Sequence, residues 1–87
     1  MTATVKINVP DNHLMAGLLG ERDEYLRVVE ESFDATVHVR GNEISLNGAQ
    51  ADDAAKVIEE LILILRNGQS LEQASVRRSI DLSLIHI

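Results

Sequence analysis

Two short alternating segments joined by a Gly-Asn pair constrain the fold of this chain more than any other feature of its sequence. Apolar and polar residues alternate over residues 36–40 and again over residues 43–47, as in half-buried β-strands. Gly41 and Asn42 between them form a two-residue connection of the kind that closes a hairpin. Residues 4–9 alternate in the same way. Because the hairpin makes its two strands antiparallel neighbours, the third strand can only join them in a three-stranded antiparallel sheet.

The remaining segments carry apolar residues at helical spacing, bounded by residues that start or stop helices. The predicted helices are a short one from Asp11 or Asn12 to Gly20, a second from Asp23 to about Phe33, a long one from Asp52 or Asp53 to Asn67-Gly68, and a last one from a capping-box pattern at residues 70–73 towards Arg78. The element order is β-α-α-β-β-α with one further short helix. This order predicts an α+β fold with the helices packed on one face of the sheet.

Composition excludes several classes of function. The chain has 87 residues, enough for one domain, and it contains no cysteine, which rules out disulfides, thiolate chemistry and Cys-ligated metal sites. Its three histidines are scattered without the spacing of metal ligands, and no nucleophile–base arrangement is visible. The sequence shows neither a signal peptide nor an apolar run of membrane-spanning length, so a cytoplasmic location without membrane contact is expected.

Two properties of the chain argue against tight binding of nucleic acid. The net charge is −6, whereas a nucleic-acid-binding domain usually carries a basic surface. One Phe, one Tyr and no Trp leave few aromatic rings on which bases could stack. Any contact with nucleic acid is therefore expected to be weak.

Several segments together resemble the N-terminal KH-like domain of the PhoH-like proteins. They are residues 18–26 (LLGERDEYL), Glu30 before Phe33, residues 39–44 (VRGNEI), residues 46–48 (LNG), the helical residues 55–61 and the Asn67-Gly68 stop. The resemblance covers about residues 4–80 and implies a KH-like domain over residues 1–80. Residues 81–87 follow no cap or turn pattern and are interpreted as a tail, either a truncation or a foreign segment.

This resemblance implies a KH fold of the eukaryotic-type topology, in which a Gly-x-x-Gly loop between two helices holds a nucleic-acid backbone. PhoH-like proteins also carry a C-terminal P-loop ATPase domain, and the family is linked to RNA metabolism and phosphate starvation. This sequence contains no Gly-x-x-x-x-Gly-Lys-Ser/Thr motif, so the ATPase domain is expected to be absent from it. The chain itself is therefore predicted to be no enzyme and to hold no cofactor or metal. ATP and Mg²⁺ are expected only for the absent domain.

The loop between the first two predicted helices has an acid where a KH loop has its second glycine. The predicted contacts with single-stranded RNA are backbone groups of Gly20, Glu21, Arg22 and Asp23, supported by Arg27 and Arg40. Glycine lets the backbone approach a phosphate, and the start of the following helix presents N–H groups to it. The alternative is a purely structural turn capped by the Asp23 side chain, with Arg40 solvated and paired with Glu43 or a helix acid.

A second class of function follows from the longest helix. Residues 61–65 (LILIL) are all apolar, so Leu63 is expected to lie off the buried stripe of that helix. Either the last helix or a partner must then cover it. The alternative to RNA binding is therefore a protein–protein interaction or oligomerisation domain, whose partner is the ATPase domain of the same protein or a second copy of the chain.

Overall fold

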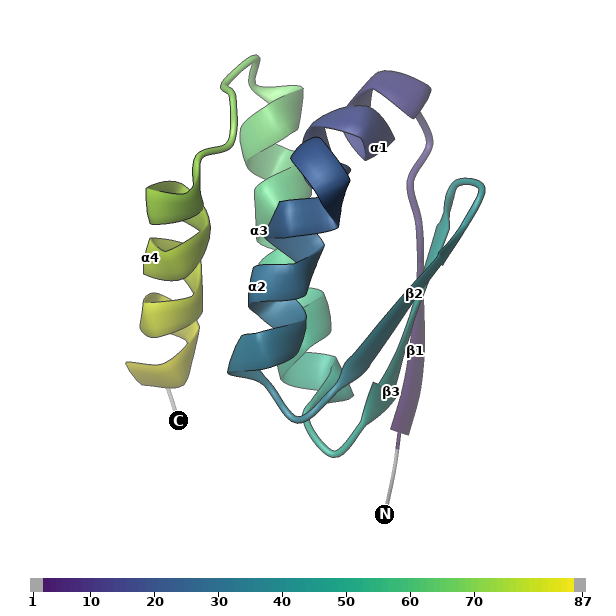
Figure 1. Cartoon of the computed structure of the whole chain (residues 1–87), viewed down its shortest axis with the longest axis vertical. Helices are drawn as coiled ribbons and strands as arrows, with labels where there is room; N and C mark the ends of the chain where they lie inside the picture. Colours follow the sequence, from purple (N-terminus) through teal and green to yellow (C-terminus); the bar gives the residue numbers. More distant parts are fainter. Residues whose placement is uncertain (1–2, 86–87) are drawn as a thin grey trace.

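A computed structural model of the chain describes residues 3–85 (Figure 1). Its elements are β1 (Ala3–Asn8), α1 (Asn12–Leu19), the 3₁₀ turn η1 (Glu21–Asp23), α2 (Glu24–Ser32), β2 (Thr36–Arg40), β3 (Glu43–Gly48), α3 (Ala51–Arg66) and α4 (Gln73–Ile85). The predicted α+β class and the predicted order of strands and helices are confirmed. The order β-α-α-β-β-α is consistent with a KH-like topology, with α4 added at its end.

β3 is the central strand of a three-stranded antiparallel sheet whose order is β1-β3-β2. Ile44 of β3 pairs with Ile7 of β1 on one side and with Val39 of β2 on the other. Arg40 pairs with Glu43 across the two-residue turn that joins β2 to β3. The predicted hairpin and the predicted sheet are therefore confirmed, and β1 and β2 are the two edges of this sheet.

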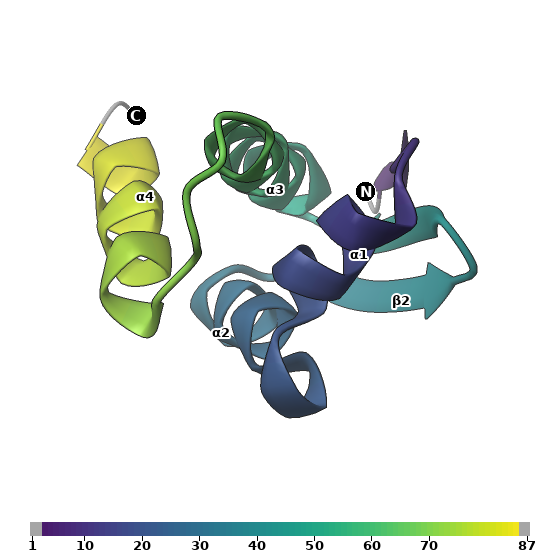
Figure 2. The ribbon, with the colours of Figure 1, turned by 90° about the horizontal axis from the view of Figure 1, so that it is seen from above.

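All the helices lie on one face of the sheet, in two layers (Figures 1 and 2). α2 and α3 pack against the strands, α1 lies beside them, and α4 packs on α2 and α3 on the side away from the sheet. The opposite face of the sheet carries polar side chains, among them the exposed Lys6 and His38 on either side of Ser45. The sheet is therefore apolar towards the helices and polar on its other side, which is the usual pattern for an antiparallel sheet.

The hydrophobic core draws on strands and helices alike. The largest fully buried side chains are Leu18, Ile44, Leu46, Ile58, Leu61, Val9, Val29, Val57 and Val76. Burial of one such side chain stabilises the folded state by about 1.5–3 kcal/mol relative to its exposure. Val76 and the nearly buried Ile80 come from α4, so this helix is part of the core and is held firmly on α2 and α3.

Helix α4 differs from its prediction at both ends. It begins at Gln73, three residues after the Ser70 of the capping-box pattern, and it continues past Arg78 to Ile85. The domain boundary drawn after residue 80 therefore lies inside a helix. That residues 81–87 are a truncated or foreign tail stays a prediction, and residues 86 and 87 lie outside the described part of the chain.

The predicted helix starts were correct for α1 and shifted for α3. The Asp11 carboxylate caps α1 by accepting a hydrogen bond of 2.8 Å from the His13 N–H. The N-cap of α3 is Gln50, so Asp52 and Asp53 stand in the first turn of the helix and not before it. Their charges there still favour the helix, because its N-terminus carries a partial positive charge.

The outer surface of α3 carries one large exposed apolar side chain. Leu63 is 58% exposed, which confirms that it lies off the buried stripe and shows that α4 does not cover it. No helix within residues 3–85 is long and apolar enough to cross a membrane.

Candidate nucleic-acid interface

The turn between α1 and α2 depends on a glycine at its first position. Gly20 has φ +66° and ψ −154°, a conformation that is essentially restricted to glycine. A Cβ atom built on Gly20 would lie 2.6 Å from the Tyr25 ring. The hydroxyl of Tyr25 donates a hydrogen bond of 2.6 Å to the carbonyl oxygen of Leu71, just before α4. The ring thus connects the turn to the segment that leads into the last helix.

The third and fourth positions of the turn have a left-handed backbone although neither is a glycine. The φ angles of Arg22 and Asp23 are +53° and +59°. Such a conformation costs an L-residue about 1–2 kcal/mol, although aspartate tolerates it better than most. The fourth position therefore has a backbone conformation that glycine adopts more readily than aspartate.

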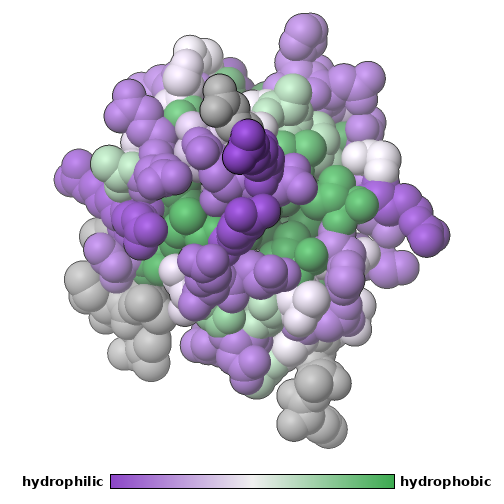
Figure 3. Space-filling view, in the orientation of Figure 1, coloured by the Kyte–Doolittle hydropathy of each residue, from purple (hydrophilic) through white to green (hydrophobic). Residues whose placement is uncertain are grey.

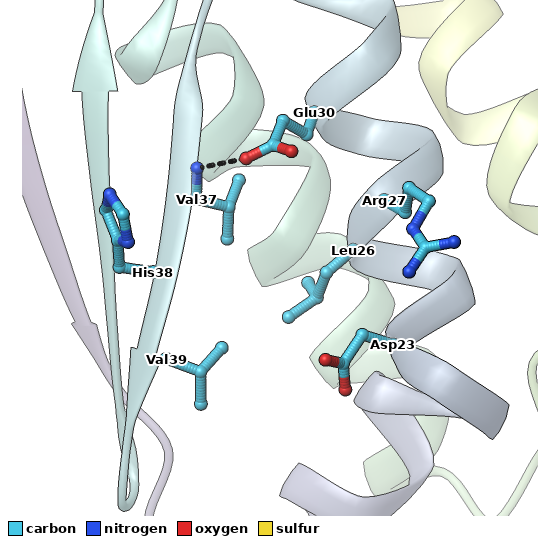
Figure 4. Close-up of a pocket in the computed structure, with 7 residues that line it drawn as sticks. All are labelled: Asp23, Leu26, Arg27, Glu30, Val37, His38 and Val39. Carbon is cyan, nitrogen blue, oxygen red and sulfur yellow. Dashed lines mark hydrogen bonds between the residues drawn. The ribbon is translucent and has the colours of Figure 1, made fainter.

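The predicted capping of α2 by the Asp23 side chain is wrong. Asp23 stands at the N-cap position, but its carboxylate makes no hydrogen bond to the first turn of the helix. The reason is the left-handed φ of this residue, because side-chain capping requires an extended N-cap backbone. In the described structure the Asp23 carboxylate instead points towards β2 (Figure 4).

A groove of about 310 Å³ opens from this turn along the space between α2 and β2. Its lining residues are Asp23, Leu26, Arg27, Glu30, Val37, His38 and Val39. Leu26 from α2 faces Val37 and Val39 from β2, and these three side chains form an apolar floor (Figure 4). Figure 3 shows apolar surface between hydrophilic rims in this region. The second helix and the second strand thus flank a groove.

A side chain of α2 hydrogen-bonds one main-chain group on the free edge of β2. The Glu30 carboxylate accepts a hydrogen bond of 2.8 Å from the Val37 N–H, which therefore points away from β3. Because main-chain groups along a strand alternate with a period of two, those of Val39 point to the same side. Val39 is also 39% exposed, so both its side chain and its backbone border the groove.

The charges around the groove are mixed. Asp23 and Glu30 contribute two carboxylates, and Arg27 contributes the one guanidinium among the lining residues. The Nη2 of Arg27 donates a hydrogen bond of 3.4 Å to the carbonyl oxygen of Arg22, which holds the guanidinium beside the turn. Within residues 3–85, no three His, Asp or Glu side chains gather into a group that could hold a metal ion.

The six residues predicted as contacts do not all lie together. Gly20, Glu21, Arg22 and Asp23 form the turn, and Arg27 lies next to it on α2. Arg40 lies at the far end of β2 and borders a different hollow, on the polar face of the sheet with Lys6 and Glu43. Its exposed position opposite Glu43 in the hairpin favours the alternative of a solvated arginine beside an acid.

Sequence reasoning missed most of the groove. Leu26, Glu30, Val37, His38 and Val39 line it but were not among the predicted contacts. The alternating pattern of residues 36–40 identified a strand, and only its edge position leaves Val39 uncovered.

Comparison with known proteins shows that the chain is similar to PhoH-like proteins of mycobacteria. PhoH-like proteins of Mycobacterium tuberculosis and Mycobacterium bovis are each 49% identical to the chain over 76 residues, or 85% of its length. The PhoH-like protein of Mycobacterium leprae is 41% identical over the same share. Over this segment, the chain is similar to the PhoH-like proteins. The PhoH-like resemblance found in the sequence is therefore confirmed.

The PhoH-like segment is a small part of such proteins. The chain spans about a fifth of the length of these curated relatives, 21% for Mycobacterium tuberculosis and 22% for Mycobacterium leprae. No family model matches the chain, and no solved structure matches it significantly.

Proposed function

We propose that this PhoH-like segment is a non-catalytic, cytoplasmic module that holds one strand of RNA for the ATPase domain of its family. The observation that carries the proposal is the groove between α2 and β2, which opens at the Gly20–Asp23 turn. The larger part of a PhoH-like protein lies outside this chain. In this proposal, the binding of ATP and Mg²⁺, the hydrolysis of ATP and any link to phosphate starvation belong to that part.

Each side of the groove suits a different part of a nucleotide. At the turn, the first N–H groups of α2 are free of the Asp23 side chain, and a helix N-terminus attracts phosphate. Leu26, Val37 and Val39 offer an apolar floor for the flat faces of bases. The main-chain groups of Val39 can hydrogen-bond a base edge, because single-stranded bases expose those edges.

The charges of the module predict weak binding. Asp23 and Glu30 oppose a phosphate backbone, and Arg27 is the side chain in the groove that attracts one. A like charge at about 5 Å in water costs roughly 0.8 kcal/mol before salt screening. We therefore expect an affinity in the weak range of non-specific binding at physiological salt, which is about 10⁻⁴ M or weaker.

Removing the Arg27 guanidinium should weaken binding measurably. We expect Arg27→Ala to lower the affinity for a short oligouridine about four-fold at low salt, because one phosphate contact is lost. Fluorescence anisotropy of a labelled strand would measure this. Arg66→Ala, at the end of α3, is the matched control, because Arg66 is exposed and is not among the residues that line the groove.

Two results would contradict the proposal. One is a wild-type chain that binds no RNA even at millimolar concentration and low salt. The other is a pair of variants, Arg27→Ala and Arg66→Ala, that weaken binding equally, because the effect would then reflect total charge and not the groove.

One observation favours protein–protein contact as a second function. Leu63 is exposed on the outside of α3, away from the groove, and the chain is acidic. In this case the domain packs on the ATPase domain or on a second copy without contacting RNA. Light scattering of the chain, alone and mixed with a separately produced ATPase domain, tests this. A chain that stays monomeric and does not bind the ATPase domain would rule out this second function.

A further inference from the structure

We propose that a second cavity, between α2 and α4, is a phosphate site that extends the groove, so that a bound strand continues over the turn onto α4. This inference rests on the proposed function. The cavity measures about 440 Å³ and is lined by Arg22, Glu24, Arg27, Val28, Glu31, Gln73 and Arg77. Three of the six arginines in the sequence therefore border one hollow.

The balance of charge in this cavity differs from that of the groove. Three arginines line this cavity together with two acidic residues, Glu24 and Glu31. In the groove the carboxylates of Asp23 and Glu30 outnumber the guanidinium of Arg27. In a chain of net charge −6, a cavity with excess positive charge marks the place where a polyanion is attracted.

Arg27 makes the two cavities continuous, because it lines both of them. Its guanidinium donates a hydrogen bond of 3.4 Å to the Arg22 carbonyl oxygen, which holds it beside the turn. A guanidinium presents a planar fork of donors that matches two oxygens of one phosphate. A strand that leaves the groove at the turn would therefore meet Arg22 and Arg27 before it reaches α4.

The third arginine of the cavity, Arg77, lies on α4, which is packed firmly against the core. Val76, the neighbour of Arg77, is completely buried, and Ile80 one turn further on is nearly so. The Tyr25 hydroxyl also holds the carbonyl of Leu71, just before α4, close to the turn. Arg77 therefore stands at a defined place across the cavity from α2, and a phosphate bound there need not order a mobile segment.

Binding at this site can be distinguished from binding in the groove by the length of the RNA. A KH-type loop clamps about four nucleotides, so a strand of that length fills the groove alone, whereas a strand of about twice the length reaches α4. We expect Arg77→Ala to weaken binding of the longer oligouridine about four-fold and of the shorter one by less than two-fold, as anisotropy would show. For the longer strand, the slope of log binding constant against log salt concentration should also become about 0.7 less steep, which is the value for one phosphate contact on a single strand.

Arg78→Ala is the matched control. Arg78 is also exposed and adjacent on α4, but it does not line the cavity, so it should leave the affinity for both strands unchanged. Equal affinities of Arg77→Ala and Arg78→Ala for the longer strand would overturn the inference. If the shorter strand still binds and still depends on Arg27, the proposed function survives that failure. A wild-type chain that binds neither strand overturns both.

Discussion

Replacing Gly20 with alanine should lower the free energy of unfolding by about 3 kcal/mol, the largest effect that we expect from one side chain at the turn. A residue other than glycine is strained by about 1–3 kcal/mol in this backbone conformation. The added Cβ would also lie 2.6 Å from the Tyr25 ring, which is held in place by its hydrogen bond to Leu71. Relief of this contact requires the ring to move and the Tyr25–Leu71 hydrogen bond to weaken.

Gly41→Ala is the matched control for this prediction. Gly41 also has a positive φ, +59°, but a Cβ atom there would have nothing within 4 Å. Its substitution should therefore cost about 1 kcal/mol, the conformational term alone. Urea denaturation measures both variants. Equal losses of stability would contradict the role assigned to the Tyr25 ring, and faster amide hydrogen exchange in α4 of Gly20→Ala would support it.

Replacing Asp23 with glycine should tighten the binding of short single-stranded RNA about ten-fold at low salt. The change removes a carboxylate that lines the groove and points towards β2. One like charge near a phosphate accounts for about 0.8 kcal/mol, and closer approach of the backbone at a glycine accounts for the rest. The left-handed backbone of position 23 needs no rearrangement, because glycine adopts it readily.

The same variant should be about as stable as the wild type. Relief of the left-handed strain at an L-residue returns about 1 kcal/mol, and loss of a negative charge beside the N-terminus of α2 removes about 0.3–1 kcal/mol. No side-chain capping bond is lost, because Asp23 makes none. Urea denaturation beside the anisotropy measurement would separate a change in binding from a change in folding.

Two controls identify the cause of the gain in affinity. Asp23→Asn removes the charge without adding a glycine, so it should give about half of the gain in free energy. Glu60→Gln removes one charge from an exposed position on α3 and should change the affinity by less than two-fold. If Asp23→Gly binds RNA no better than the wild type, the turn does not face the strand, and the proposed site is wrong.

The hairpin shows why the sheet could be predicted from the sequence. Gly41 and Asn42 are the two residues between the alternating segments. A connection this short joins two strands as antiparallel neighbours in a hairpin. The turn at Gly20 could also be predicted from local sequence, because a glycine after an apolar helical segment commonly ends a helix. The cap at Asp23 was mispredicted because the sequence does not show its left-handed φ, which depends on how α1 and α2 pack.

The sequence by itself determined the strands, the helices and the likeness to the PhoH-like proteins, because hydrophobic spacing and turn residues act over a few neighbouring positions. Only the tertiary structure decided which side chains meet. Val39 borders the groove because β2 is an edge strand. The next residue, Arg40, does not line the groove, because successive side chains of a strand point to opposite faces of the sheet. Arg77 joins Arg22 and Arg27 because α4 packs on α2, a contact between residues about fifty positions apart that no local pattern encodes.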